Sequence, residues 1–307
     1  MIVTITLNPA LDKTSTIETL HVGQLNRLQN VTEDIGGKGI NVSRAIAALG
    51  GTSVAVGFIG GNSGNLILKS LEVLGITTDF VHVRSNTRTN LKILDKFGTL
   101  TEFNEPGANV IQSEVDALLN VITKVVKSGT LVVMSGSLCQ GVDADFYAKL
   151  IRLVHNLGGY AFLDTSGEPL RAAIQEKPDF VKPNKHELME FFDIKDEIDF
   201  IQLKQLCLQL MDCGIPRMAL SLGQDGAMFF DGKNYLRAEG IKVSTLSSVG
   251  AGDSMMGAIT YAVEKNMPWH ECVKLAVATS AGAVTTKGTN PPSKELVETL
   301  IKRVKIF

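Results

Sequence analysis

In residues 247–254, two glycines and an alanine directly precede an aspartate, and an apolar, helix-forming segment follows. Gly250 and Gly252 allow backbone conformations in which free N–H groups approach a ligand closely and point at phosphate oxygens. Asp253 is predicted to open a helix over residues 253–263, with its carboxylate at the positive end of the helix dipole. An anion site with a base at its edge is what phosphoryl transfer to a hydroxyl requires. The alternative is that Asp253 only caps a helix after a glycine turn.

A second glycine cluster, residues 36–39, precedes an amphipathic helix predicted over residues 41–49 and contains Lys38. It again places backbone N–H groups at a helix N-terminus, so it is a second candidate anion site, with a structural turn as the alternative. The spacing is not that of a Walker A loop, and the sequence contains no GxGxxG. The sequence motifs therefore do not indicate a P-loop or a dinucleotide-binding function.

The elements that must position these residues alternate between strand-like and helical patterns along most of the chain. The pairs are 53–58 with 64–74, 130–134 with 144–156, 159–164 with 169–175, and 180–181 with 185–192. Such alternation predicts βαβ units and a mainly parallel sheet covered on both faces. In such sheets the site lies at the carboxyl ends of strands. Polar segments follow three of these strands, at 135–137, 164–167 and 182–184, although each could be a simple turn.

Residues 11–20 and 87–103 break this alternation, because they read as strands with no helix between them and with a hairpin turn at residues 96–99. They are predicted to form a small separate sheet. Residues two apart on a strand share one face, and here that face carries Arg88, Asn90 and Lys92. A solvated strand face is one interpretation. A lid that receives a phosphate or a polyhydroxylated ligand is the other, since arginine can bind phosphate bidentately.

Composition excludes several classes of function. The formal net charge of −2 argues against a general nucleic-acid binder, and no segment approaches the roughly 18 apolar residues of a membrane span. The four cysteines lack any CxxC spacing, so reduced thiols are expected. The first residues alternate like a half-buried strand and lack a basic region or a cleavage site. We therefore expect a cytoplasmic protein that binds neither nucleic acid nor a membrane.

Eight motifs, in order and over the whole length, carry a resemblance to a known family. They are residues 8–12, 36–42, 87–90, 135–138, 164–167, 182–187, 221–226 and 249–254. Together they resemble the ribokinase-like sugar kinases of the phosphofructokinase B type. Within that family the chain is most similar to 1-phosphofructokinases, with tagatose-6-phosphate kinases as the near alternative. Residues 87–92 and 249–253 favour fructose 1-phosphate over tagatose 6-phosphate.

The resemblance implies an α/β fold with a central, mainly parallel sheet flanked by helices, and a small β-sheet lid. The main domain would comprise residues 1–10, 21–86 and 106–307, and the lid would comprise residues 11–20 and 87–105. A homodimer formed through the lid is expected, because exposing an apolar outer face that includes Leu91 and Ile93 to solvent would be unfavourable.

The resemblance also implies roles for individual residues. Asp253 matches the catalytic base, and Gly250, Ala251 and Gly252 match the anion hole. Residues matching those that hold the sugar phosphate are Asp12, Gly37, Lys38, Asn41, Arg88, Asn90 and Ser137. Lys38 and Arg88 would face the phosphate that the substrate already carries, and Lys92 is a further candidate from its strand face. Residues matching the ATP side are Lys182, Asn184, Ser221, Gly223, Gly226 and Ser248. The far wall of the nucleotide pocket would come from the helix around residues 278–282.

The implied cofactors are ATP and Mg²⁺. Asn184 and Glu187 match a pattern that positions Mg²⁺ through water, and they also fit a capping box. The pKa of Asp253 is expected near or below 4, because a helix N-terminus favours the carboxylate. Cys139 stands where the family usually has proline, so the shape of that loop is open.

The implied activity is ATP-dependent phosphorylation of a hexose phosphate, with fructose 1-phosphate converted to fructose 1,6-bisphosphate. Besides tagatose 6-phosphate, the alternatives are a kinase for an unphosphorylated sugar and a non-catalytic regulator that binds a sugar or a nucleotide.

Overall fold

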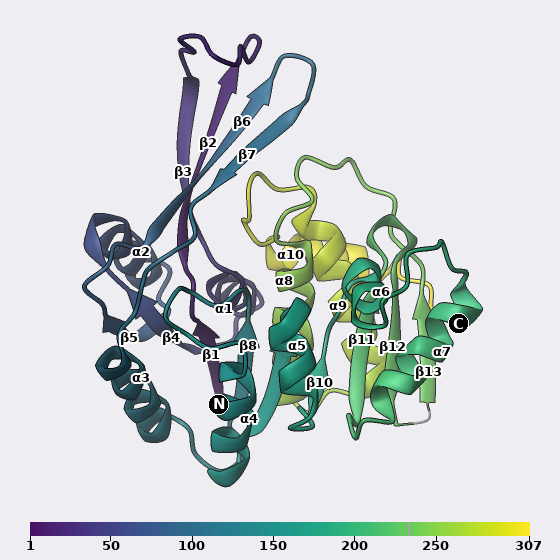
Figure 1. Cartoon of the computed structure of the whole chain (residues 1–307). Coiled ribbons are helices and arrows are strands. Elements are labelled where there is room, and N and C mark those ends of the chain that lie inside the picture. The colour runs from purple at the N-terminus through teal and green to yellow at the C-terminus, as the bar shows by residue number, and fades with distance from the viewer. Residues whose placement is uncertain (233) are drawn as a thin grey trace.

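The computed structural model of the chain describes residues 1–232 and 234–307 (Figure 1). Its main sheet has nine strands in the order β13-β12-β11-β10-β9-β8-β1-β4-β5. The strands are β1 (Ile2–Thr6), β4 (Val54–Ile59), β5 (Thr77–His82), β8 (Leu131–Ser135), β9 (Tyr160–Asp164), β10 (Phe180–Val181), β11 (Arg217–Ser221), β12 (Ala227–Asp231) and β13 (Asn234–Ala238). All pairings from β5 to β11 are parallel, and β12 and β13 join one edge antiparallel. The predicted fold class is confirmed.

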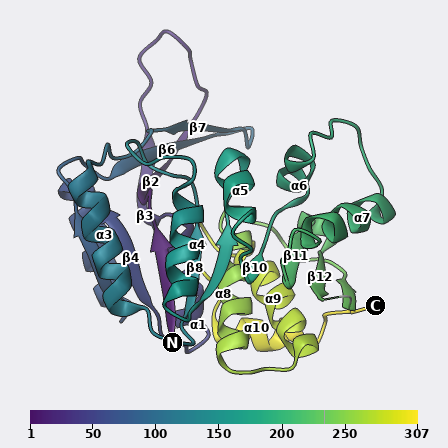
Figure 2. The same cartoon turned by 60° about the horizontal axis from the view of Figure 1, so that its bottom comes forward.

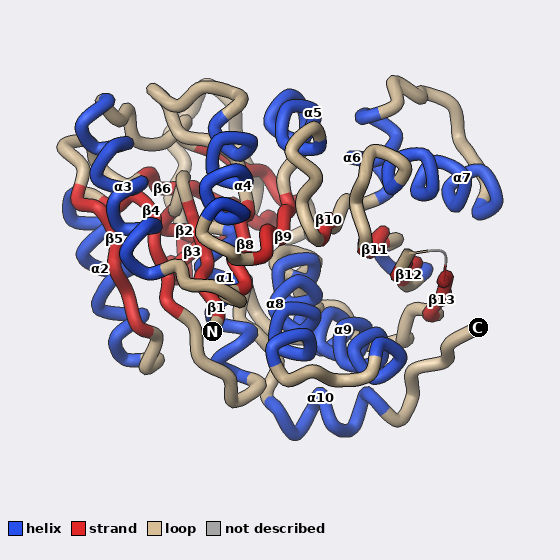
Figure 3. Tube along the Cα trace, turned by 90° about the horizontal axis from the view of Figure 1, so that it is seen from below, coloured by secondary structure: helices blue, strands red, loops and turns tan. Residues whose placement is uncertain are grey.

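Helices cover both faces of this sheet, as the view from below shows (Figure 3). One layer contains α3 (Gln112–Val125), α4 (Phe146–Asn156), α5 (Gly167–Ile174), α6 (Lys185–Phe191) and α7 (Phe200–Met211). The other contains α1 (Lys38–Ala48), α2 (Gly61–Val73), α8 (Ala251–Glu264), α9 (Trp269–Ala283) and α10 (Lys294–Ile301). Strand β1 shows why two layers are needed: Ile2 packs into one core, and Val3 and Ile5 pack into the other. A strand buried on both faces has apolar residues at successive positions.

A second, four-stranded sheet stands out from the main body, at the top of Figure 1, in the order β3-β2-β6-β7. Its strands are β2 (Ala10–Ile17), β3 (Gln29–Gly36), β6 (Arg88–Asp95) and β7 (Leu100–Asn104). A turned view shows this sheet crossing above the ends of the main sheet (Figure 2). The turn between β6 and β7 includes the predicted residues 96–99, and Gly98 N donates to Asp95 O.

Strand β3 corrects the predicted boundary, because residues 21–86 were all assigned to the main domain. It pairs antiparallel with β2 in the small sheet. Its first five residues are exposed, so the strand has little of the apolar alternation by which a half-buried strand is recognised.

Two further predictions concern the ends of elements and the cysteines. Helix α8 begins at Ala251, two residues before the predicted start, because Gly250 takes the N-cap position in the left-handed region, with φ 82°. The four cysteines are free, as expected. Within residues 1–232 and 234–307, no helix combines the length and the apolar character that a membrane span requires.

Candidate active site

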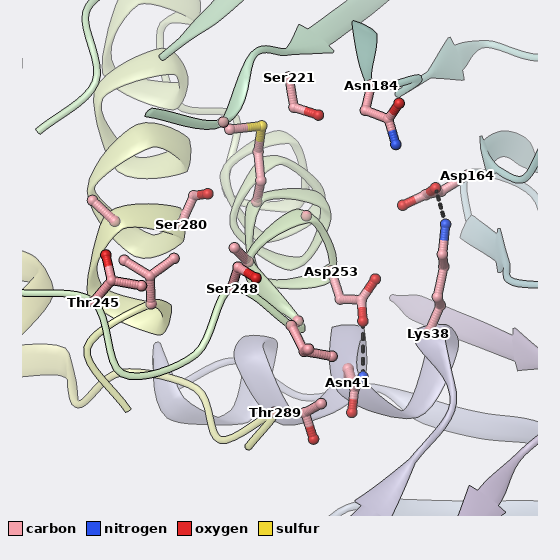
Figure 4. A pocket seen from close by; sticks show the side chains of 18 of the residues that line it. Lys38, Asn41, Asp164, Asn184, Ser221, Thr245, Ser248, Asp253, Ser280 and Thr289 are labelled. Carbon is pink, nitrogen blue, oxygen red and sulfur yellow. Dashed lines mark hydrogen bonds and ion pairs between the residues drawn. The ribbon is translucent and has the colours of Figure 1, made fainter. Parts of the chain in front are cut away.

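A cavity of about 1280 Å³ lies between the small sheet and the carboxyl ends of the main-sheet strands. It is lined by all but one of the predicted site residues. The lining residues labelled in Figure 4 come from segments far apart in the sequence. Those from the small sheet and α1 are Asp12, Gly37, Lys38, Asn41, Arg88 and Asn90. Those from the remaining chain are Lys182, Asn184, Glu187, Ser221, Gly223, Gly226, Ser248, Gly250, Ala251, Gly252 and Asp253.

Asp253 is the third residue of α8 and is only 7% exposed. Its Oδ2 accepts a hydrogen bond from Nδ2 of Asn41 at 2.8 Å, so the side chain is directed toward α1. Because Gly250 occupies the N-cap position, Asp253 is not the cap of α8. The residue instead lines the cavity together with residues 250–252 of the glycine loop.

The pKa of Asp253 contradicts the sequence-based expectation. Burial raises it to about 6, and the negative charge of Asp164 adds to this shift. Lys38, the hydrogen bond from Asn41 and Lys182 act in the opposite direction, but they do not reverse it. The expected value near or below 4 was wrong because the loss of solvation outweighs the favourable helix N-terminus.

Two lysines meet a buried carboxylate beside the glycine loop. Asp164, at the end of β9, is 2% exposed. Its Oδ1 accepts from Nζ of Lys38 at 3.0 Å, and its Oδ2 lies 2.9 Å from Nζ of Lys182. Burial alone would raise the pKa of Asp164, but Lys182 and Lys38 hold it below its ordinary value. The attraction of Asp164 raises the pKa of Lys38 against the opposing effect of burial, so its ammonium stays charged.

Lys38, which the resemblance assigns to the phosphate that the substrate already carries, is paired with carboxylates in this structure. Its Nζ also lies 3.7 Å from Oε1 of Glu187. The ammonium is thus directed toward Asp164, at the end of β9 (Figure 4). It also lies near Glu187. Lys182 is close to the glycine loop, because a Cβ added to Gly252 would lie 3.2 Å from its Nζ.

The predicted row of β6 does share one face, since Arg88, Asn90 and Lys92 all line the cavity. Two of the three bind Asp12: Nδ2 of Asn90 donates to Oδ1 at 2.8 Å, and Nζ of Lys92 donates to Oδ2 at 2.9 Å. The charge of Lys92 is therefore balanced within the sheet.

Arg88 is held differently. Its Nη1 donates to the carbonyl of Glu105 at 3.3 Å, and its Nη2 donates to the carbonyl of Asn8 at 3.2 Å. In the part of the chain that the structure describes, its guanidinium has no carboxylate partner within ion-pair distance. Arg88 thus differs from Lys92 on the same strand face, because its charge is not balanced by direct pairing.

The expected apolar outer face is only partly as predicted. Ile93 is buried at 6% exposure and Leu91 is half-buried. The prediction that Ile93 is exposed was wrong. The alternation of residues along one strand does not show what packs against each of its faces. The large exposed apolar side chains of the small sheet and its loops are Val22, Leu25, Leu28, Val31, Leu94, Phe97, Leu100 and Phe103.

The opposite wall of the cavity carries the residues predicted for the nucleotide. Gly226 has φ 95°, and a Cβ there would lie 2.0 Å from the carbonyl of Ala238, so only glycine fits. Val277, Ser280 and Ala281 of α9 line the same space, as predicted for the far wall.

Asn184 and Glu187 form the predicted capping box at the start of α6. Glu187 N donates to Oδ1 of Asn184, and Asn184 N donates to Oε2 of Glu187, both at 2.9 Å. Oε1 of Glu187 is left facing the cavity near Lys38. Within residues 1–232 and 234–307, no group of three or more His, Cys, Asp or Glu side chains is arranged to hold a metal. A single carboxylate near phosphates suits Mg²⁺, which keeps several waters, so the donor set fits that ion.

Ser137 is the predicted site residue that does not line the cavity. Its Oγ lies 3.3 Å from Nδ2 of Asn8, which also donates to the carbonyl of Leu138 at 3.1 Å. Cys139, in place of the usual proline, is 4% exposed, and burial raises the pKa of its thiol to about 12. It is a packed side chain and not a reactive one.

Sequence reasoning placed Asp164 in a polar segment at the carboxyl end of a strand but gave it no role in the site. It is the last residue of the buried strand β9. Its partners, Lys38 and Lys182, are distant in sequence, so only the folded chain reveals the triad.

Comparison with known proteins agrees with this geometry. The profile of the pfkB family carbohydrate kinase matches residues 3–296. The 1-phosphofructokinase of Borreliella burgdorferi is 33% identical over 307 residues, which cover 100% of this chain and 98% of that protein. The 1-phosphofructokinase of Bacillus subtilis is 32% identical over 311 residues, which cover 100% and 99%.

Solved structures show the same architecture. Phosphofructokinase-2 from Escherichia coli in complex with potassium superposes with a TM-score of 0.93 at 30% identity, covering 98% of both chains. Ribokinase from Arabidopsis thaliana, complexed with ribose and ATP, has a TM-score of 0.81 at 21% identity, covering 98% of both, and supports the fold alone. The chain therefore belongs to the pfkB family of carbohydrate kinases and is an ATP-dependent sugar kinase with a ribokinase-like fold.

Proposed function

We propose that the protein phosphorylates a hexose phosphate, namely fructose 1-phosphate, to give fructose 1,6-bisphosphate and ADP. The observation that carries the proposal is the buried carboxylate of Asp253, set between the glycine loop of α8 and a small sheet that presents Arg88. The matching relatives named 1-phosphofructokinase support this substrate. Tagatose 6-phosphate stays the near alternative.

In the proposed reaction, the acceptor hydroxyl lies beside Asp253, whose Oδ1 is not engaged by Asn41. The hydroxyl oxygen forms a bond to the γ-phosphorus of ATP as the bond from phosphorus to the ADP oxygen breaks. The hydroxyl proton passes to Asp253. A carboxylate with a pKa near 6 is a better base near neutrality than an ordinary aspartate.

The charge of the transferred group would be stabilised by backbone N–H groups of residues 250–252 and by the ammonium of Lys182. Lys38, held by Asp164, would add a second positive charge on the same side. Glu187 with Asn184 would hold Mg²⁺, which neutralises phosphate charge when bound.

Recognition of the phosphate already on the sugar is assigned to Arg88. Its charge is not balanced by a carboxylate, whereas Lys92 is already paired with Asp12. Asp12 and Asn90 are then placed to bind sugar hydroxyls. Replacing Arg88 with Ala is expected to raise KM for fructose 1-phosphate far more than KM for ATP. Equal effects on both KM values in steady-state kinetics would contradict this assignment.

The direct test of the proposed base is Asp253→Asn. We expect both substrates to bind, with turnover reduced about 10²- to 10⁴-fold, which corresponds to about 3–5 kcal/mol. ATP consumption is measured against a panel of fructose 1-phosphate, tagatose 6-phosphate, fructose 6-phosphate and ribose. Retained turnover in the variant would remove Asp253 from the mechanism. A best acceptor other than fructose 1-phosphate would correct the substrate and leave the base in place.

We also propose that the protein forms a homodimer through the small sheet. The edge strands β3 and β7 are largely exposed, and apolar side chains gather there. Phosphofructokinase-2 from Escherichia coli is described in a tetrameric inhibited form, so assembly in related proteins is not limited to dimers.

A further inference from the structure

Arg44, on α1, is buried in a way that the proposed reaction does not explain. It is 6% exposed, and burial lowers the pKa of its guanidinium, a shift that Asp34 partly opposes. In the described part of the chain it has no carboxylate within ion-pair distance, and its Nε has no hydrogen-bond partner. Burying a charge with only neutral partners is costly, and such groups are rare in cores that serve packing alone.

The three neutral partners of Arg44 belong to two segments that are far apart in the sequence and touch each other in the fold, since Oγ1 of Thr289 also donates to the carbonyl of Ile35 at 3.5 Å. Its Nη1 donates to the carbonyl of Ile35 at 3.1 Å and to Oγ1 of Thr289 at 3.1 Å. Its Nη2 donates to Oδ1 of Asn290. Ile35 lies at the end of β3, where the small sheet joins the main body, and residues 289–290 lie in the loop after α9.

That loop is in contact with the anion hole. A Cβ added to Gly250 would lie 3.3 Å from both Cα and Cβ of Thr289. The residue before Thr289 touches the small sheet as well, because a Cβ added to Gly288 would lie 2.7 Å from Oδ2 of Asp34. The same helix α1 that carries Arg44 also carries Asn41, which donates to Asp253.

We propose that Arg44 is a positioning residue that couples the small sheet to the anion hole. Through Ile35 it holds the root of the sheet that binds the acceptor, and through Thr289 it holds the loop against Gly250. The acceptor site and the phosphoryl site then keep a fixed relative geometry, which in-line transfer requires because small misplacements are costly. This inference rests on the proposed kinase function.

The test measures binding and not turnover, and it removes the link without removing the buried charge. Thr289→Val removes, with little change in shape, the hydroxyl that accepts from Arg44 and donates to the carbonyl of Ile35. Thr285→Val makes the same change nearby. Thr285 serves as the control because its Oγ1 donates to the carbonyl of Gly282. Arg44→Lys is the second variant, since it keeps the charge but cannot reach all three acceptors.

Binding of a non-hydrolysable ATP analogue is titrated calorimetrically with and without fructose 1-phosphate. In the unmodified protein and in Thr285→Val, fructose 1-phosphate should change the Kd of the analogue by about fivefold or more. In Thr289→Val and Arg44→Lys the change should fall below about twofold, with each Kd measured alone shifted by less than about threefold. Equal coupling in all four proteins would overturn the proposal, and so would an absence of coupling in an unmodified protein that binds fructose 1-phosphate.

Fructose 1-phosphate titrated alone reports separately on the proposed substrate, so its failure to bind would count against that substrate only. Amide hydrogen exchange of the ligand-free proteins then decides the role of Arg44. Exchange at residues 250–253 should be faster by about tenfold in Thr289→Val than in Thr285→Val. Equal exchange in these two variants would overturn the coupling.

Discussion

Burial of the Asp253 carboxylate is unfavourable for its charged form. The resulting rise in pKa suits the proposed role of Asp253 as a base. An exposed aspartate would be a weaker base at neutral pH, whereas loss of solvation raises the pKa of Asp253 to about 6. The nearby ammonium of Lys38 limits the shift, so the carboxylate is still ionised at neutral pH. The positive and negative groups around it thus place its pKa close to the pH at which it would act.

The activity should depend on pH through this group. Asp253 accepts a proton only as a carboxylate, so kcat/KM should be constant well above pH 6 and fall about tenfold per pH unit below it. Lys38 lowers the pKa of Asp253. In Lys38→Met the acid limb should therefore move to higher pH, measured between about pH 5 and pH 9.

The control for this shift is Lys13→Met, which removes the same charge from a lysine that pairs with Glu33. Its acid limb should stay where it is in the unmodified protein. A limb in Lys38→Met that stays in place or moves to lower pH would contradict the assignment of that limb to Asp253.

The same shift in pKa predicts a gain in stability when Asp253 is neutralised. The folded pKa is raised from 3.8 to about 6, so folding favours the protonated form. Above pH 6 the folded protein must bury the charge, at a cost of up to about 3 kcal/mol, and below about pH 4 the cost disappears. Asp253→Asn should thus unfold at a higher temperature than the unmodified protein at pH 8. The difference should shrink as the pH falls through 6, and calorimetry showing a less stable variant at pH 8 would refute it.

At the scale of elements, the N-terminus of α6 has an observed capping box and a proposed Mg²⁺ site in the same two residues. The capping box uses Oε2 of Glu187 and the side chain of Asn184, which leaves Oε1 of Glu187 for the cavity. The structural and the metal-binding interpretations of this motif are therefore compatible. They require different chemical properties of the side chain at position 187. The cap needs a hydrogen-bond acceptor, whereas Mg²⁺ needs a negative charge.

Glu187→Gln separates these demands, because glutamine can still form a capping box. We expect its melting temperature to match that of the unmodified protein, while the Mg²⁺ concentration for half-maximal activity rises about tenfold or more. Glu187→Ala should show the same metal effect and also lose about 1 kcal/mol of stability. If Glu187→Gln needed no more Mg²⁺ than the unmodified protein, the carboxylate would have no part in holding the metal.

The elements that the sequence predicted best are those whose own residues carry a clear pattern of apolar and polar positions. The main sheet was predictable because its strands are buried on both faces and alternate with helices. Strand β3 was not, because most of its residues are exposed and its stability comes from pairing with β2. The pKa of Asp253 also could not be read from the sequence, since the helix N-terminus is a local feature and burial depends on distant segments. Asp164 and Arg44 have the same explanation: their partners are brought together only by the fold.

At the scale of the whole molecule, the cavity is lined by residues of two sheets, and these sheets differ in how far other elements cover them. The main sheet is stabilised by helix layers on both faces, but the small sheet is covered mainly near its root. Its outer part exposes Phe97 at 73% and Phe103 at 53%. Apolar groups gathered on a projecting sheet with two exposed edges are typical of an interaction surface, and a second copy of the chain offers the same surface in return.

The proposed dimer predicts a change in mass when this surface is made polar. Phe103 and Leu91 line a shallow hollow on the face of the small sheet that also carries Lys13. Phe103→Ser removes a large apolar group from that hollow and should shift the protein from dimer to monomer at micromolar concentration in sedimentation. Ile201→Ser, at a side chain 70% exposed on α7 in the main body, should leave the dimer intact. Because the small sheet also carries Arg88 and Asp12, which we propose bind the acceptor, a monomeric variant should lose kcat/KM for fructose 1-phosphate at low protein concentration. An unmodified protein that sediments as a monomer would rule out this assembly.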